Sequence, residues 1–401
     1  MDANNPITKA RYDIWYERQS GDVNEFIRQI SRTAELSDHP HAMRIEKNVP
    51  IYDGDRVRAC AASHDGRLEL TAEWAKIFLS GAGVVAIKNA FNDTEAVDAA
   101  TAMFKQMIDQ EKASGAGAGD HFAKPGANDR VWNALGKHAV ADPENFVRYY
   151  SNHCLDLASR AWLGDGYQVT AQVNRVNPGG EPQTPHRDYH LGFMPGERAI
   201  RFPAHTHALS AALTLQGAIA HVDMPLESGP TLYLPFSQQF AEGYVAYTRP
   251  EFQAVFAEHH VQLPLEKGDA VFFNPALMHG SGHNKSADIL RLANLIQVSS
   301  AMGRPIENVD RAQVCRAIYP HLADAKLHDA QLKALIAASA EGYAYPTNLD
   351  TDLPVGGLAP LTQAEILRQA LADDVSVDAF AALMVEWESR RQALAFRMHT
   401  T

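Results

Sequence analysis

A histidine and an aspartate stand two positions apart at His186 and Asp188, and a second histidine follows at His279. Because side chains alternate with a period of two along an extended strand, a His-x-Asp pair places an imidazole and a carboxylate on the same side. Together with a distant histidine, this pair can occupy one face of a metal ion, as in the two-histidine, one-carboxylate sites of non-heme Fe(II) enzymes. The spacing therefore predicts an iron site with coordination positions left open.

An arginine follows the second histidine at Arg291. A guanidinium group can form two parallel, charge-assisted hydrogen bonds with a carboxylate, which suits the binding of a dicarboxylic acid. An open iron site with a carboxylate clamp nearby indicates an enzyme that uses 2-oxoglutarate and O2. We therefore expect Fe(II) as the cofactor, with 2-oxoglutarate and O2 as cosubstrates.

Two alternatives to these ligands are present in the chain. A second His-x-Asp pair lies at His221 and Asp223, and with 18 histidines roughly one such pair is expected by chance. A jelly-roll site joins an early strand to a late one, and only the first pair leaves room for about five strands before His279. His283 is an alternative second imidazole, although the alternating glycines after His279 favour His279 at a strand end.

Composition narrows the function classes. The chain has 401 residues, 46% of them hydrophobic and 21% charged, as in an ordinary globular protein. Its net charge of −12 argues against nucleic acid or an anionic membrane surface as a partner, and we expect a small-molecule substrate. No apolar run approaches the ~18–20 residues of a membrane span, and no secretory signal is visible, so we expect a cytoplasmic protein. The oligomeric state stays open.

Cysteines add no further site to this picture. The chain has too few of them, too widely scattered, for a disulfide framework or a zinc-ribbon spacing: Cys60, Cys154 and Cys315.

The middle of the chain has the pattern of a β protein. Apolar and polar residues alternate from about residue 167, after a first strand-like run at 84–87. Turn signals separate further strand-like runs at 208–220, 230–235, 259–265, 269–273 and 291–298. Many short strands with tight turns are typical of an antiparallel barrel or sandwich of the jelly-roll kind.

Helical spacing flanks this region on both sides. It occurs around Phe26, at 74–78, at 93–113 and at 143–163. A glycine-rich stretch at 113–119 predicts a loop that could form a lid. Towards the end of the chain, Thr362 and Glu365 can form a capping box with a Leu361–Ile366 hydrophobic staple, and Phe380–Trp387 carries a core-facing stripe.

We therefore predict an α+β protein with a mainly β core and flanking helices. The core, at 71–300, is a double-stranded β-helix of the jelly-roll or cupin-like kind. Residues 1–70 form a polar, largely irregular N-terminal extension, and residues 301–401 form a helical C-terminal extension packed on the core. All three parts belong to a single domain over 1–401.

Four segments occur in an order that resembles one known family. They are Asn177–Gly180 leading to His186–Asp188, Asp223 with Glu227–Pro235, Gly268–Phe273, and His279–Arg291. Over about residues 70–300 the chain resembles the phytanoyl-CoA dioxygenase family of Fe(II)/2-oxoglutarate oxygenases. In this pattern Asp223 belongs to a core strand and turn and is not a ligand.

The resemblance implies a role for each matching position. His186, Asp188 and His279 would ligate iron and form the catalytic centre. Arg291 would pair with the distal carboxylate of 2-oxoglutarate, with a hydroxyl contributed by Ser281. Gln216 matches a position used for the cosubstrate.

The substrate is not identified by the sequence. Gln172 and Asn174 point inward on the strand before His186, and Arg187 and Arg198 flank the site, so we expect these four near the substrate. Related halogenases lack the carboxylate ligand, and its presence here favours hydroxylation or desaturation. Two other classes are a cupin-like dioxygenase or isomerase without 2-oxoglutarate, against which the arginine clamp argues, and a non-catalytic jelly-roll binding protein, against which the intact triad argues.

Overall fold

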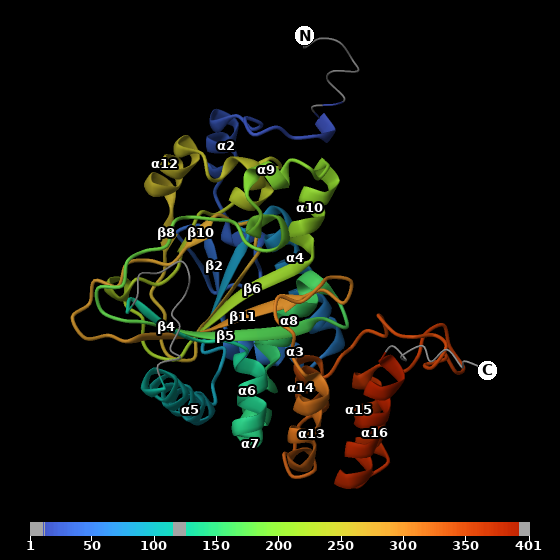
Figure 1. Ribbon diagram of the computed structural model, residues 1–401. Helices are drawn as coiled ribbons and strands as arrows, with labels where there is room; N and C mark the ends of the chain where they lie inside the picture. Colours follow the sequence, from blue (N-terminus) through green and yellow to red (C-terminus); the bar gives the residue numbers. More distant parts are fainter. Residues whose placement is uncertain (1–10, 12, 115–125, 393–401) are drawn as a thin grey trace.

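The computed structural model describes residues 11, 13–114 and 126–392, and these form two sheets with helices around them (Figure 1). The large sheet has the strand order β1 (Arg44–Glu46), β2 (Val49–Asp53), β3 (Val84–Lys88), β9 (Ala270–Phe273), β6 (Thr214–Ala220), β11 (Arg291–Ser299), β5 (Gln168–Val176) and β4 (Asn128–Val131). The small sheet has the order β10 (His279–Gly280), β7 (Leu232–Tyr233) and β8 (Val261–Gln262). The pairings are antiparallel except between β2 and β3. The predicted double-stranded β-helix is confirmed.

The central strands β5, β11 and β6 fix which side chains point into the fold. Leu295 of β11 pairs with Gln172 of β5 on one side and with Ala218 of β6 on the other. Because side chains alternate, residues in step with these three face the space between the two sheets. The other residues face the helices, so β5 is buried along its whole length.

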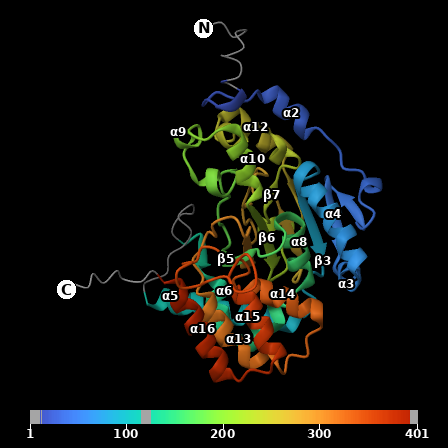
Figure 2. The ribbon, with the colours of Figure 1, turned by 90° about the vertical axis from the view of Figure 1, so that its right-hand side faces the viewer.

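Helices cover the sheet and close both ends of the molecule (Figures 1 and 2). One group lies along the β5 side and contains α5 (Thr94–Ala113), α6 (Ala134–Ala141), α7 (Pro143–Tyr150), α13 (Arg311–Leu322), α14 (Asp329–Ser339), α15 (Gln363–Ala372) and α16 (Val377–Arg391). A second group at the opposite end contains α2 (Val23–Ile30), α9 (Gly196–Ala199), α10 (Ala204–Ala212) and α12 (Pro250–His259). The remaining helices are α3 (Gly54–Ala61), α4 (His64–Ser80), α8 (His153–Leu163) and α11 (Gly243–Ala246).

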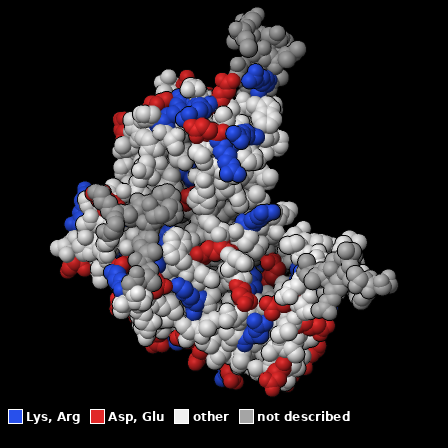
Figure 3. Space-filling model, in the orientation of Figure 1, with Lys and Arg blue, Asp and Glu red and all other residues white. Residues whose placement is uncertain are grey.

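Within the described residues, no helix is both long enough and apolar enough to cross a membrane. On the face shown in Figure 3, basic and acidic side chains are intermixed and no extended patch of one sign is seen.

Several predicted boundaries were wrong. The predicted strand at 208–220 begins only at Thr214, and residues 204–212 are helical. A short apolar run of this kind does not distinguish a strand from a buried helix. The predicted helix at 143–163 is two helices, since Asn152 caps a new one through its side chain. Residues 44–53 of the supposedly irregular N-terminal extension contribute two strands to the large sheet. Of the predicted loop at 113–119, residues 115–119 lie outside the described residues.

The C-terminal helices pack on the core. The predicted capping box of Thr362 and Glu365 is confirmed, and Leu361 of the predicted staple is 63% exposed. Of the predicted stripe on α16, Phe380 is buried and stacks on Tyr319 of α13 with ring centroids 3.9 Å apart. In turn, α13 packs against α6 and α7.

We expect residues 305–401, expressed alone, to lack a cooperative fold. Arg311 is buried and donates a hydrogen bond of 2.7 Å to the carbonyl of Val169 in β5, a partner that the fragment would lose. In the isolated fragment, Arg311 would lack this hydrogen bond and the face of α13 that packs on the core would be exposed to solvent. Both changes would favour the unfolded chain. Thermal unfolding followed by circular dichroism is the measurement. A sharp, reversible transition in the isolated fragment would instead make it a second domain.

Two histidines lie in the core as neutral groups. Burial lowers the pKa of His138 to about 4 and that of His221 to about 3. His138 shares a hydrogen bond of 2.8 Å with Asn145, while His221 contacts Thr101 at 2.8 Å and Tyr149 at 2.9 Å. Protonation of either imidazole would therefore place an uncompensated charge in the core.

Stability should therefore fall in mild acid. The unfolded chain binds protons at these histidines below about pH 6.5, whereas the folded chain stays unprotonated, so protons favour unfolding. The free energy of unfolding should be flat above that pH and drop below it by roughly 1.4 kcal/mol per pH unit for each histidine. Urea unfolding at about pH 7.5 and about pH 5.5 measures the drop, and His221→Gln should make it smaller by the contribution of one histidine. Equal stability at both pH values would contradict the account.

Candidate functional site

A cavity of about 700 Å³ lies between the two sheets. Its walls come from β5, β6 and β11 of the large sheet, from β7 and β10 of the small sheet, and from the segment around His186–Pro195. The lining also includes Arg130 and Trp132 and, from the C-terminal segment, Ile306 and Glu307. A volume of this size suits a small organic ligand together with a cosubstrate.

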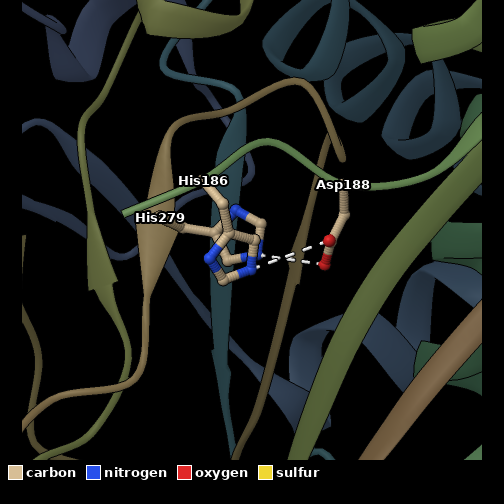
Figure 4. A group of neighbouring side chains, drawn as sticks. All are labelled: His186, Asp188 and His279. Atoms are coloured by element: carbon tan, nitrogen blue, oxygen red, sulfur yellow. Dashed lines mark ion pairs between the residues drawn. The ribbon is translucent and has the colours of Figure 1, made fainter. Parts of the chain in front are cut away.

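His186, Asp188 and His279 meet inside this cavity (Figure 4). His186 lies in an extended segment that pairs with β10 through a single bridge, and the two histidines exchange backbone hydrogen bonds of 2.8 and 3.0 Å. One potential ligand atom from each residue lies within 4.8 Å of the others. In the described part of the chain, this is the sole group of three such residues.

The two imidazole rings are held so that the same nitrogen of each faces the carboxylate. The Nδ1 atoms of His186 and His279 donate to the carbonyls of Thr184 and Leu277, each at 2.8 Å. This fixes Nε2 as the unprotonated nitrogen of each neutral ring, the one that can bind a metal. The Nε2 atoms lie 3.6 and 3.4 Å from the two oxygens of Asp188. Two neutral imidazole nitrogens and one carboxylate are donors that Fe(II) accepts, so the residues fit the metal.

The pKa shifts of Asp188 and His279 favour the forms that bind a metal. Burial by itself would raise the pKa of Asp188, but the hydrogen bonds and charges of His186 and His279 outweigh it and hold that pKa well below its usual range. Burial, followed by the neighbouring His186, lowers the pKa of His279. An ionised carboxylate and an unprotonated imidazole are the metal-binding forms of these side chains.

Three further hydrogen bonds fix the position of Asp188. Gln216 donates to its Oδ2 at 2.6 Å, Tyr244 donates to its carbonyl at 3.2 Å, and its own N–H donates to Pro275 at 2.8 Å. The next residue, Tyr189, has a φ of 53°, in the left-handed region that costs a non-glycine residue energy. The chain turns sharply just after the carboxylate, and the residues that follow, such as Phe193 and Met194, still line the cavity.

Arg291 forms the second part of the site. It is buried at the start of β11, and its Nη2 donates to the Ser281 hydroxyl at 2.6 Å. Burial lowers its pKa to about 10, so it stays charged at neutral pH, and no carboxylate of the described residues pairs with it. A buried guanidinium without a counter-charge is costly, which makes it a receptor for an anionic ligand.

Some predicted site residues do not reach the cavity. Arg187 is buried on the opposite side of its segment, where it donates to the carbonyls of Ser237 and Phe240, because period-two alternation turns it away from its two neighbours. Arg198 lies exposed on α9, outside the cavity lining. The expectation that these two arginines meet the substrate is therefore corrected.

The other predicted residues line the cavity. Gln172 and Asn174 do so from β5, as expected. Gln216 lines it as well, but its amide serves Asp188 and does not lie beside Arg291. Sequence reasoning missed Gln297 and Glu307. Gln297 is in step with Arg291 on a predicted strand and could have been found by alternation, whereas Glu307 lies in a loop without a periodic signal.

The alternative ligands lie elsewhere. His221 is buried in the core against Thr101 and Tyr149, and Asp223 accepts a hydrogen bond of 2.9 Å from the N–H of Lys267. His283 is outside the group of three ligands.

Comparison with known proteins agrees with this geometry. A sequence model of the family Phytanoyl-CoA dioxygenase (PhyH) matches residues 79–293, which contain all three ligand candidates and Arg291. The chain belongs to the phytanoyl-CoA dioxygenase family. It is thus a non-heme iron enzyme that depends on 2-oxoglutarate, and the resemblance stated from its motifs is confirmed. No curated protein matched the sequence.

Several solved structures are similar to this member of the family. SnoN, an alpha ketoglutarate dependent epimerase from nogalamycin biosynthesis, is 18% identical, with 75% of this chain and 92% of that chain covered and a TM-score of 0.39. The carbocyclase SnoK from the same pathway is 21% identical over 59% of this chain and 86% of that chain, with a TM-score of 0.41. AviO1 from Streptomyces viridochromogenes Tue57 is 18% identical over 59% and 97%, with a TM-score of 0.41.

Proposed function

We propose that the protein oxidises a C–H bond of a small organic metabolite, by hydroxylation or desaturation, and releases succinate and CO2. His186, Asp188 and His279 would hold Fe(II), and Arg291 with Ser281 would hold the distal carboxylate of 2-oxoglutarate. The observation that carries this proposal is that the ligand triad and an unpaired buried guanidinium open into one cavity.

Each group of the chain has a defined task in this proposal. Bound iron supplies the oxidative chemistry with O2. Arg291 fixes the cosubstrate through a two-pronged ion pair, which the Ser281 hydroxyl extends. Gln216 keeps Asp188 oriented through its short hydrogen bond. Asp188 favours hydroxylation or desaturation over halogenation, because a halide would need its place on the metal.

The proposal is tested by succinate release across a panel of small metabolites, with Fe(II), 2-oxoglutarate and O2 supplied. We expect at least one compound to accelerate succinate formation and to gain one oxygen atom or lose two hydrogens, as seen by mass spectrometry. The Arg198→Ala variant is the matched control, because this exposed arginine lies outside the cavity. Succinate release that persists after all iron is removed would refute the proposal.

A further inference from the structure

The cavity has two polar ends that differ in chemistry. Arg291 and Gln297 face it from opposite ends of β11, about 20 Å apart at strand spacing. Between them the floor contains Leu295 and two small side chains, Ala293 on β11 and Ala218 on β6, which leave room for ligands. At the end away from Arg291, Arg130 and Tyr189 contact a group of amide and carboxylate side chains. These four side chains are here called the amide wall: Gln172, Gln216, Gln297 and Glu307.

Hydrogen bonds within the amide wall use up some of its polar atoms. The Nε2 atom of Gln172 donates to Oε1 of Gln297 at 3.3 Å and to Oε1 of Glu307 at 3.4 Å. The same oxygen of Glu307 accepts from the N–H of Asn133 at 2.9 Å, and Oε1 of Gln172 accepts from Arg130 at 3.0 Å. These bonds hold the wall in place without a ligand.

Two acceptor oxygens of the wall have no donor. The Nε2 atom of Gln216 must be the atom that faces the Asp188 carboxylate, because only the amide nitrogen can donate to it. This leaves Oε1 of Gln216, a residue only 8% exposed, with no hydrogen-bond partner among the described residues. The same holds for Oε2 of Glu307. Burial raises the pKa of Glu307, as expected for a carboxylate with too few donors.

A buried acceptor without a donor destabilises the site, and a ligand that supplies the donor would remove this penalty. An anionic group would face two acceptors and be repelled, and an alkyl group would leave both unsatisfied. Only a group with O–H or N–H donors completes both oxygens. Phe193, Met194 and Ile306 line the cavity as well and would cover the apolar part of such a ligand.

We propose that the amide wall is the substrate subsite, and that the substrate presents two hydrogen-bond donors, hydroxyl or amino, to Gln216 and Glu307. This inference rests on the proposed function. The donor bound by Gln216 lies beside Asp188 and so holds the neighbouring carbon next to the metal. The wall thereby selects which C–H bond is oxidised.

The test uses anaerobic full-length protein loaded with Fe(II) and 2-oxoglutarate, whose visible charge-transfer absorption reports the assembled centre. The probes are isomeric cyclohexanediols, aminocyclohexanols, the dimethyl ethers of the diols, and cyclohexanedicarboxylates. We expect at least one diol or amino alcohol to perturb the absorption with an affinity at least about tenfold higher than its ether or the dicarboxylates. Equal binding of the ethers, or an assembled centre that no donor probe perturbs, overturns the inference. A missing absorption band counts against the proposed function instead.

Two variants of Glu307 sharpen the result. Glu307→Leu should reduce binding of the best donor probe by about tenfold or more while the absorption band persists, which shows that the fold is intact. Glu307→Gln keeps an acceptor but no charge, so it should spare hydroxyl probes and weaken amino probes. Glu144→Gln, at an exposed position on α7, is the control and should change neither. Unaltered binding of the best donor probe by Glu307→Leu contradicts the proposal.

Discussion

Replacing Arg291 by alanine is expected to weaken 2-oxoglutarate binding by about 2–5 kcal/mol, which is roughly thirty-fold to several thousand-fold. The wild-type guanidinium is buried and charged, and its hydrogen bonds go to Ser281 and to backbone carbonyls at 3.4 Å. A dicarboxylate would supply the missing counter-charge in a dry environment. Without the arginine, the distal carboxylate of the cosubstrate would be buried unpaired.

Calorimetric titration with Fe(II) present, under anaerobic conditions, measures this effect. Arg198→Ala is the control, since it removes an exposed arginine from α9 and should leave the affinity unchanged. Iron binding by Arg291→Ala shows that the variant is folded. An unaltered affinity would mean that another cation, such as the exposed Lys285, holds the cosubstrate.

Replacing Asp188 by alanine is expected to lower the affinity for Fe(II) by more than about 100-fold and to abolish 2-oxoglutarate turnover. Loss of a hydrogen-bond partner behind a metal ligand already costs 10–100-fold, so loss of the only anionic ligand must cost more. The two histidines would also lose the carboxylate that their Nε2 atoms face at 3.6 and 3.4 Å. Equilibrium dialysis with iron quantification measures the affinity.

The second His-x-Asp pair offers the matched control. Asp223→Asn changes the carboxylate that accepts from Lys267 and should leave iron binding as in the wild type. Iron loss in Asp223→Asn together with iron retention in Asp188→Ala would reverse the ligand assignment.

Local spacing predicted those parts of the site that lie on extended chain, where side chains alternate with a period of two. His186 and Asp188 share a side because they are two apart, and the same rule explains why Arg187 points into the protein and not towards a substrate. The order of segments along the chain was enough to separate this pair from the one at His221. The same alternation places Gln297 on the face of β11 that lines the cavity.

Parts of the site and fold that depend on tertiary placement were not predictable in this way. Glu307 reaches the cavity from a loop after β11, and loops carry no periodicity that relates them to a distant wall. The apolar run at 208–213 is mostly helix, although a strand was predicted there. A short apolar pattern indicates burial but does not distinguish a helix from a strand. The strands at 44–53 form because an edge of the large sheet is available to them, which the local sequence does not reveal.

The most direct test of the account is an anaerobic titration of the metal-free protein with Fe(II) and then with 2-oxoglutarate, followed by visible absorption. We predict a charge-transfer band that saturates at one iron and one 2-oxoglutarate per chain, that is missing in Asp188→Ala, and that needs far more 2-oxoglutarate in Arg291→Ala. Absence of the band in the wild type, or an undiminished band in Asp188→Ala, would contradict the assignment of the iron centre to His186, Asp188 and His279.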